Sequence, residues 1–139
     1  MSVSTVGNGR VELSAQTVLV AVGDLLAIAL FVAAGEFSHN INPLLNPGQF
    51  AGTLTPFYIG WLVVATVGGL YTAAATKTLQ TSLGRAIVGW VLAVGIAQGI
   101  RATSLFPGDA ALTFALVSVL VGGTLLVLWR AVVAVSLNR

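Results

Sequence analysis

The chain has 139 residues, of which 57% are hydrophobic and only 7% are charged. Because soluble domains carry roughly a quarter of charged residues, this composition excludes a water-soluble fold and indicates a lipid bilayer. The net charge of +2 comes from six Lys and Arg residues scattered singly, which argues against nucleic-acid binding. With no Cys and one His, the chain offers neither a disulfide nor a metal centre, and no cofactor is expected.

Four apolar segments are long enough to cross a bilayer as helices, since about 20 residues cover ~30 Å of hydrocarbon. They are predicted at residues 14–35, 56–75, 83–104 and 110–135. Asn42-Pro43 and Asn46-Pro47-Gly48 favour turns and place one sizeable outer loop at 36–55. The other links are short, which favours antiparallel neighbours. The prediction is an all-α integral membrane protein, a four-helix transmembrane bundle with up-down-up-down topology and tails at 1–13 and 136–139.

A cleavable signal peptide is the alternative interpretation of the first segment, with Arg10 before it and Ala33-Ala34-Gly35 near a cleavage point. Asp24 lies halfway along the segment, and an acidic residue there is foreign to a signal peptide. The segment is also longer than the apolar region of such peptides. We therefore expect it to remain as a membrane span.

Basic residues near helix ends predict the orientation, because Lys and Arg are retained on the cytoplasmic side. With both termini inside, five basic residues are cytoplasmic and Arg101 alone lies outside; the five are Arg10, Lys77, Arg85, Arg130 and Arg139. Aromatic residues prefer the two membrane interfaces, which places Phe57, Tyr58, Trp61 and Phe106 at the outer one and Trp129 at the inner one. The predicted location is the cell membrane, multi-pass, with cytoplasmic termini.

Small residues predict where the helices approach each other closely. Gly95 and Gly99 form a GxxxG spacing in the third segment, and similar small pairs are Gly23 with Ala27, Gly69 with Ala73, and Gly122-Gly123. Packing within the chain is the favoured interpretation of the GxxxG spacing. A homo-oligomer or a partner in a membrane complex stays open as the alternative.

Asp24 is the first candidate functional residue, because an ionised carboxylate in hydrocarbon costs about 2.5–3.5 kcal/mol on insertion scales. It must face protein or water. One interpretation is a proton or cation site, and the other is a hydrogen-bonded Asp that locks helices together. No second carboxylate accompanies it in the sequence.

Four further polar residues extend from Asp24 towards the outer surface. Gln98 and Arg101 share one face of the third helix, and Glu36 and His39 flank the outer end of the first. We expect Arg101 to pair with Glu36, with Asp24, Asp109 and snorkelling to the headgroups as alternatives. Together the five residues could form a polar track for protons or small ions, with histidine as its pH-responsive group. The alternative is a solvated loop with one interfacial ion pair.

No enzyme signature accompanies these residues. The sequence contains no phosphate-binding glycine loop, no HExxH and no nucleophile elbow. Its four acidic residues are isolated from one another, at positions 12, 24, 36 and 109. Tyr58, Thr66, Tyr71 and Ser118 could hydrogen-bond between helices without any chemistry. We therefore expect no catalysis.

The chain resembles the membrane proteins grouped as domain of unknown function 3054, over nearly its whole length. The residues that carry the resemblance are Asp24, Gly35 before Ser38-His39, Pro56-Phe57, Gly60-Trp61, Gly95 through Arg101, Phe114, and Trp129-Arg130. Glu36 stands where many members have a basic residue, so the resemblance implies no fixed charge there. It raises interest in Asp24, His39 and Arg101 and implies no activity.

The leading hypothesis is a non-enzymatic membrane protein that conducts or senses protons or small ions through the track of Asp24, Glu36, His39, Gln98 and Arg101. One alternative is a structural or accessory subunit of a membrane complex without transport activity. A weaker alternative is an intramembrane enzyme.

Overall fold

The computed structural model describes residues 4–6, 11–72, 78–103 and 112–137. Several predicted positions lie outside the described residues, namely those of Arg10, Ala73, Lys77, Phe106, Asp109 and Arg139. Within the described part, four helical segments are long and apolar enough to cross a membrane. These segments are α1 (Ala15–Ser38), α2 (Pro47–Val67), α3 (Leu79–Arg101), and a last one made of α4 (Leu112–Val117), the π-helical turn η1 (Ser118–Gly122) and α5 (Gly123–Leu137).

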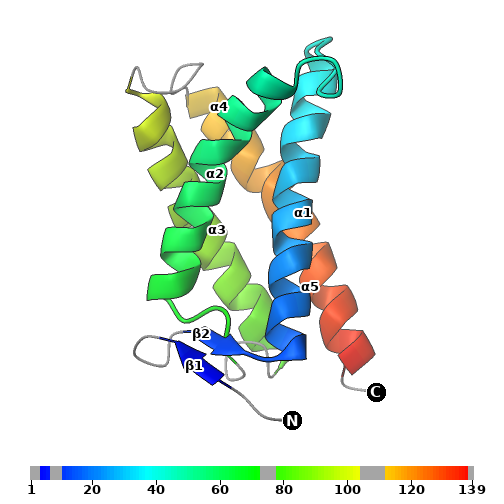
Figure 1. Cartoon of the computed structure of the whole chain (residues 1–139), viewed down its shortest axis with the longest axis vertical. Coiled ribbons are helices and arrows are strands. Elements are labelled where there is room, and N and C mark those ends of the chain that lie inside the picture. The colour runs from blue at the N-terminus through cyan, green and yellow to red at the C-terminus, as the bar shows by residue number, and fades with distance from the viewer. Residues whose placement is uncertain (1–3, 7–10, 73–77, 104–111, 138–139) are drawn as a thin grey trace.

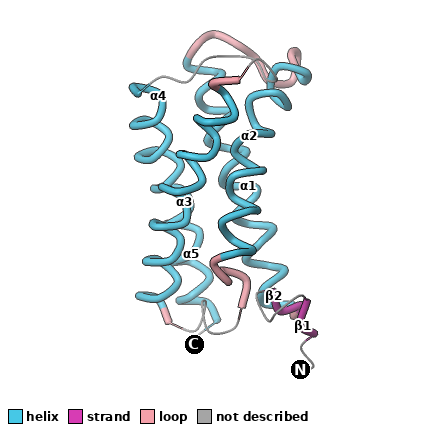
Figure 2. Tube along the Cα trace, turned by 90° about the vertical axis from the view of Figure 1, so that its left-hand side faces the viewer, coloured by secondary structure: helices cyan, strands magenta, loops and turns pink. Residues whose placement is uncertain are grey.

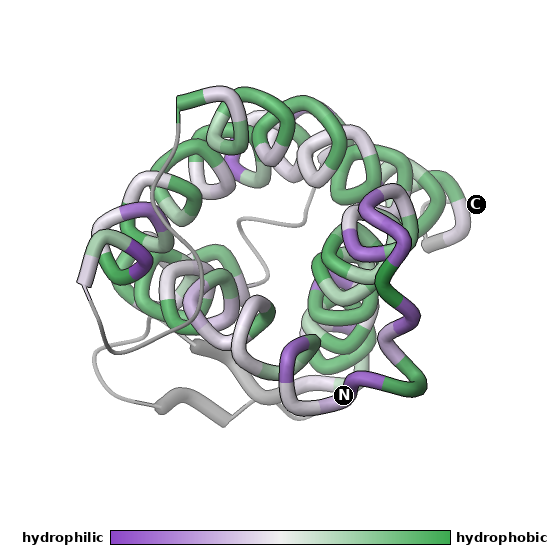
Figure 3. The backbone as a smooth tube through the Cα atoms, turned by 90° about the horizontal axis from the view of Figure 1, so that it is seen from above, coloured by the Kyte–Doolittle hydropathy of each residue, from purple (hydrophilic) through white to green (hydrophobic). Residues whose placement is uncertain are grey.

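The helices form an antiparallel bundle in which the chain runs up and down in turn (Figures 1 and 2). α1 packs against α2 and α5, and α3 packs against the same two helices, so the cross-section is a square with neighbours in chain order. We call the end that holds residues 39–46 the loop end, and the end that holds β1 and the last turn of α5 the terminal end. Viewed along the bundle, the tubes are mostly hydrophobic in colour (Figure 3). The predicted all-α, four-helix bundle is confirmed.

Both ends of helix α1 are capped by hydrogen bonds. Ser14 accepts a hydrogen bond from the Thr17 amide at 3.2 Å and its own amide donates to the Thr17 hydroxyl, which is a capping box. At the other end, Asn40 adopts a left-handed φ of 62°, and the Ile41 amide donates back to the Glu36 carbonyl at 2.9 Å. The helix therefore continues to Ser38, past the predicted end at Gly35.

Helix α2 begins at Pro47, although the span was predicted to begin at Pro56. Proline suits the first helical position, because its missing N–H would have no partner there, so the Asn46-Pro47-Gly48 turn signal marks a helix start. As a consequence, Phe57 and Trp61 lie deep within α2 and are 0% exposed. Their predicted place at the outer interface was wrong.

The predicted second span was also wrong in running to residue 75. Gly69 adopts a left-handed φ of 65°, and the Leu70 amide donates to the Ala65 carbonyl at 2.9 Å, which is a Schellman cap. The chain then turns back into the bundle, where Leu70, Tyr71 and Thr72 are buried. We call these three residues the re-entrant segment. It brings Tyr71 into the interior of the bundle.

The third and fourth segments lie close to their predicted positions. Thr78 caps α3 through a hydrogen bond from the Thr81 amide at 3.1 Å. The fourth segment contains the π-helical turn η1, and the Trp90 indole donates to the Ser118 carbonyl in that turn at 2.8 Å. An indole of α3 thus satisfies a carbonyl of the neighbouring helix.

A short β-hairpin precedes α1. Its strands β1 (Ser4–Val6) and β2 (Val11–Leu13) pair antiparallel with Ser4 opposite Leu13. The sequence predicted only a cytoplasmic tail here. β2 also contacts α1.

Glycines allow the closest contacts inside the bundle. Only some of these glycines are ones that the sequence predicted to lie at helix contacts. A Cβ at Gly23 would stand 1.8 Å from the Trp129 ring, and one at Gly60 would stand 2.5 Å from the Ala93 carbonyl oxygen. Gly95 and Gly99 have no such neighbour within 4 Å and are exposed. The favoured interpretation of the GxxxG spacing, packing within the chain, was wrong because this face of α3 points out of the bundle.

Candidate functional site

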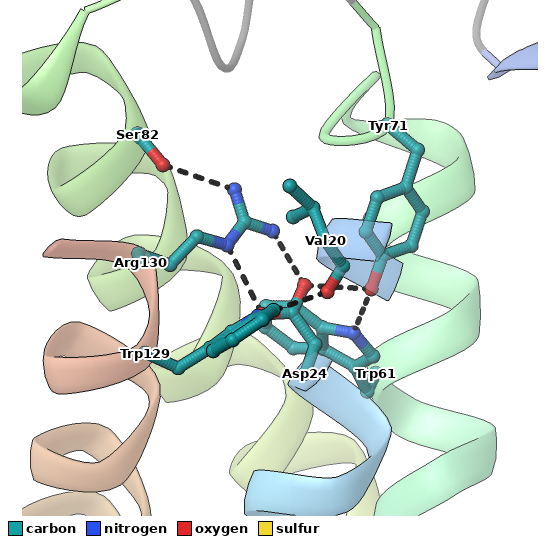
Figure 4. Close-up of polar contacts among 7 residues, drawn as sticks. All are labelled: Val20, Asp24, Trp61, Tyr71, Ser82, Trp129 and Arg130. Carbon is teal, nitrogen blue, oxygen red and sulfur yellow. Dashed lines mark hydrogen bonds and ion pairs between the residues drawn. The ribbon is translucent and has the colours of Figure 1, made fainter. Parts of the chain in front are cut away.

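Asp24 forms an ion pair with Arg130, the one ion pair that joins two described residues. The Arg130 Nη2 and Nε atoms donate to the two carboxylate oxygens of Asp24 at 2.6 and 3.1 Å (Figure 4). Both side chains are 0% exposed. This two-point geometry is the strong form of an Arg–carboxylate contact. A complete ion pair therefore lies in the interior of a bundle of apolar helices.

Tyr71 and Trp61 extend the pair into a chain of donors. The Tyr71 hydroxyl donates to Asp24 Oδ2 at 2.9 Å and accepts from the Trp61 indole at 2.7 Å. Burial and the neighbouring Asp24 carboxylate raise the pKa of Tyr71, so the phenol stays protonated and acts as a donor. The Asp24 carboxylate therefore accepts hydrogen bonds from two directions.

Further hydrogen bonds connect Arg130 and its neighbour Trp129 to other segments of the bundle (Figure 4). Arg130 Nη1 donates to the Ser82 hydroxyl at 3.3 Å, and the Trp129 indole donates to the Val20 carbonyl at 3.1 Å. We call Asp24, Trp61, Tyr71, Ser82 and Arg130 the Asp24 network. Its members come from α1, α2, the re-entrant segment, α3 and α5. It lies in the terminal half of the bundle, because Ser82 belongs to the first turn of α3.

The partner of Asp24 differs from the one considered in the sequence. Arg101 lies at the end of α3 near the loop end, whereas Arg130 is only 1% exposed and faces Asp24. The prediction that Arg130 is one of the cytoplasmic basic residues was wrong, because its side chain is buried in the bundle. The position of Arg130 inside an apolar segment was the signal that could have identified the pair.

An aromatic layer separates this network from the polar residues of the loop end. It consists of one ring from each helical segment, namely Phe31, Phe57, Trp90 and Phe114. Ring centroids lie 5.3 Å apart for Phe31 and Phe57 and 5.8 Å apart for Phe57 and Trp90. Three of the rings are at most 2% exposed: those of Phe31, Phe57 and Trp90. The layer therefore interrupts the predicted track between Asp24 and Glu36.

The other four predicted track residues gather at the loop end. Glu36, His39 and Arg101 line one pocket of about 520 Å³ between the helices, and Gln98 lies one turn before Arg101 on α3. Glu36 is 6% and Arg101 9% exposed, whereas His39 caps α1 and is exposed. Among the described residues, no ion pair joins Glu36 to Arg101. The structure thus groups these residues without the predicted ion pair.

Hydrogen bonds between helices were predicted for four hydroxyl residues, and two of them make such bonds to α1. Tyr58 donates to the Leu25 carbonyl at 2.8 Å, and Tyr71 donates to Asp24. The Ser118 hydroxyl instead donates to the Phe114 carbonyl of its own helical segment at 2.6 Å. The Tyr58 and Ser118 hydrogen bonds stabilise packing, so the Asp24 network and the pocket are the candidate sites.

Comparison with known protein families gives a match. Residues 21–133 match the family model described as "Protein of unknown function (DUF3054)". The matched range contains both candidate sites and the aromatic layer. No curated protein and no solved structure matches the chain.

Proposed function

The chain belongs to the DUF3054 family, and we propose that this four-span membrane protein senses protons or small ions through its buried polar residues. The observation that carries the proposal is the Asp24–Arg130 pair inside the bundle. Charged residues within membrane spans are costly and commonly mark ion pathways or sensors. The Asp24 carboxylate holds α5 and the re-entrant segment against α1, so a change in its charge would alter how these elements pack.

The aromatic layer favours sensing over conduction. An ion or a proton chain needs water or polar groups along its whole path, and four packed rings supply neither. The same rings connect the two polar regions, because Arg101 lies 4.7 Å from the Phe114 centroid and Trp90 lies 6.3 Å from Trp61. A response at either region can therefore reach the other through direct contacts.

Tryptophan fluorescence of the purified protein tests this proposal, since Trp61 belongs to the Asp24 network. We expect wild type to show a pH-dependent or cation-dependent change that Asp24→Asn abolishes, because Asn keeps the shape and cannot titrate. His39→Gln is the control for titration at the pocket. In liposomes with a pH gradient, we expect no proton flux from either wild type or Asp24→Asn. Flux in wild type that the substitution removes would support conduction instead.

A structural or accessory subunit is the second candidate function. The observation in its favour is that both Asp24 oxygens have donors from within the chain, as expected of a lock between helices. In that case, Asp24→Asn would leave the fluorescence response of wild type unchanged. Both candidates are non-catalytic: in the first, the Asp24 carboxylate titrates or responds to an ion, and in the second it only joins helices.

We also propose that both termini are cytoplasmic, so that the loop end faces outward. β1 and the end of α5 lie at the same end of the bundle (Figure 1). Without the buried Arg130, the basic residues still divide four against one, with Arg10, Lys77, Arg85 and Arg139 against Arg101. Single cysteines at Asn46 and Ser136 should label from the outside and the inside respectively. Labelling of both from one side would contradict the orientation.

A further inference from the structure

The pocket at the loop end has the size and walls of a small-molecule site. Its volume of about 520 Å³ falls within the usual range for ligand pockets. Phe31, Val32, Phe114 and Val117 make its apolar walls. Phe31 and Phe114 also belong to the aromatic layer, so the layer closes the pocket towards the centre of the bundle. These walls suit a ligand with an apolar body, and an aromatic one in particular.

The wall of this pocket carries a buried carboxylate that the described part of the chain leaves unsatisfied. Glu36 is 6% exposed, and neither of its carboxylate oxygens has a hydrogen-bond partner among the described residues. Buried polar groups in native proteins nearly always have partners, and a buried ionised carboxylate without one is costly. A carboxylate of this kind at the wall of a ligand-sized pocket indicates that its partner is a ligand.

The chemistry of that partner follows from what a buried carboxylate needs. Its oxygens accept hydrogen bonds and its charge attracts a positive group, so an ammonium group satisfies both requirements at once. A metal ion suits the pocket less well, because the described residues contain no group of three or more acidic, His or Cys side chains that could hold one. Arg101 also lines the pocket, but it has interactions of its own, so no ligand group is assigned to it.

We propose that this pocket binds an organic ammonium ion with an apolar body. The ammonium N–H groups donate to the Glu36 carboxylate, and the apolar body packs against Phe31, Phe114 and Val117. A free amine and a membrane-borne amine share this chemistry. The pocket does not include Asp24, so the proposal is independent of ion sensing there.

Thermal unfolding in detergent tests the proposal, because a ligand that binds the folded protein raises its Tm. The first probe is phenethylammonium, and its matched analogues are neutral phenethyl alcohol, anionic hydrocinnamate and quaternary phenethyltrimethylammonium. We expect phenethylammonium to bind roughly tenfold or more tightly than each analogue, since the first two lack the positive charge and the third lacks N–H donors. The second probe is dodecylammonium, measured against dodecanol. Binding of phenethylammonium identifies a free solute as the ligand, and binding of dodecylammonium alone identifies a membrane-borne amine.

Glu36→Gln tests the assigned contact. It keeps the size of the side chain and removes its charge, so binding of the ammonium probe should weaken roughly tenfold or more, to the level of the neutral analogue. Glu12→Gln in β2 is the matched control, because it removes an acidic charge at the terminal end of the bundle, and it should bind as wild type. Should Glu36→Gln fail to fold, the ranking of the ammonium probes and their analogues in wild type still tests the proposal.

Equal binding of an ammonium probe and any of its analogues would overturn the proposal, as would the absence of a Tm shift with both ammonium probes. Unchanged binding in Glu36→Gln would overturn it too. The same titration in Asp24→Asn should match wild type, which separates a failure of this proposal from a failure of ion sensing. Loss of binding in Asp24→Asn would move the ammonium to Asp24 and overturn the assignment to Glu36.

Discussion

The Asp24 network and the pocket at the loop end both bury charge, but they differ in what satisfies it. In the network, three donors from Arg130 and Tyr71 reach the Asp24 carboxylate within 3.1 Å. In the pocket, the Glu36 carboxylate has no hydrogen-bond partner. A satisfied charge pair fixes the packing of the elements that supply it, whereas an unsatisfied carboxylate remains available to a ligand. The difference assigns stability chiefly to one region and recognition to the other.

Removal of one member of the Asp24–Arg130 pair should give the largest effect. Arg130→Leu leaves a buried carboxylate with only the Tyr71 donor, and we expect a loss of about 3–5 kcal/mol in the free energy of unfolding. Asp24→Leu should cost a similar amount. The double variant should recover much of the loss, because no buried charge is left alone. Denaturant unfolding in detergent micelles measures all three.

The matched control is Arg85→Leu, which removes an exposed arginine at the terminal end. It should change the free energy of unfolding by less than about 1 kcal/mol. Equal losses for Arg85→Leu and Arg130→Leu would show that the pair does not dominate stability. The comparison between the two regions would then lose its basis.

The packing that supports the aromatic layer should give the next largest effect. A Cβ at Gly122 would stand 2.4 Å from the Trp90 ring, so Gly122→Ala should cost about 1–3 kcal/mol through overpacking. Gly95→Ala is its control, because nothing lies within 4 Å of a Cβ there. Thermal unfolding should lower the Tm of the first variant and not of the second. Similar Tm values for both would mean that Trp90 moves freely and that the layer is loosely packed.

Tyr71→Phe should have a smaller effect on the Asp24 network. It removes the bond to Asp24 and leaves the Trp61 indole without its acceptor, so we expect a loss of about 1 kcal/mol. Trp61 fluorescence should shift as well, since the indole loses its partner. Tyr58→Phe is the matched control, because Tyr58 bonds only to the Leu25 carbonyl, away from Trp61. A fluorescence shift of the same size in both variants would contradict the role assigned to Tyr71.

Much of the bundle could be predicted from the sequence because bilayer thickness sets helix length. Four apolar runs and short links were sufficient for topology, and the positions of α1 and α3 follow within a few residues. The two ends of α2 could not be predicted in the same way. Pro47 acts as a helix start and Gly69 as a helix stop, and each depends on cap geometry that hydropathy does not record.

The candidate sites were partly predictable for a related reason. Asp24, Glu36 and Arg101 are noticeable in the sequence because charge is rare in apolar segments. Their partners were not predicted, since Arg130 was counted among the cytoplasmic basic residues and Tyr71 is buried only because the re-entrant segment turns inward. Both depend on contacts between residues far apart in the chain, with 106 positions separating Asp24 from Arg130. Helix periodicity gives no information about such contacts.

The smallest expected effect is the coupling between Glu36 and Arg101, which sharpens the contrast with Asp24 and Arg130. The sequence predicted an ion pair there, and the structure shows both residues at one pocket without such a pair. In a double-mutant cycle of Glu36→Gln and Arg101→Leu, the two losses of unfolding free energy should therefore add to within about 0.5 kcal/mol. The same cycle for Asp24→Leu and Arg130→Leu should be strongly non-additive, because those charges touch. Strong coupling would mean that Glu36 and Arg101 form an ion pair in the membrane. Both regions would then hold a paired charge and would differ only in their position along the bundle.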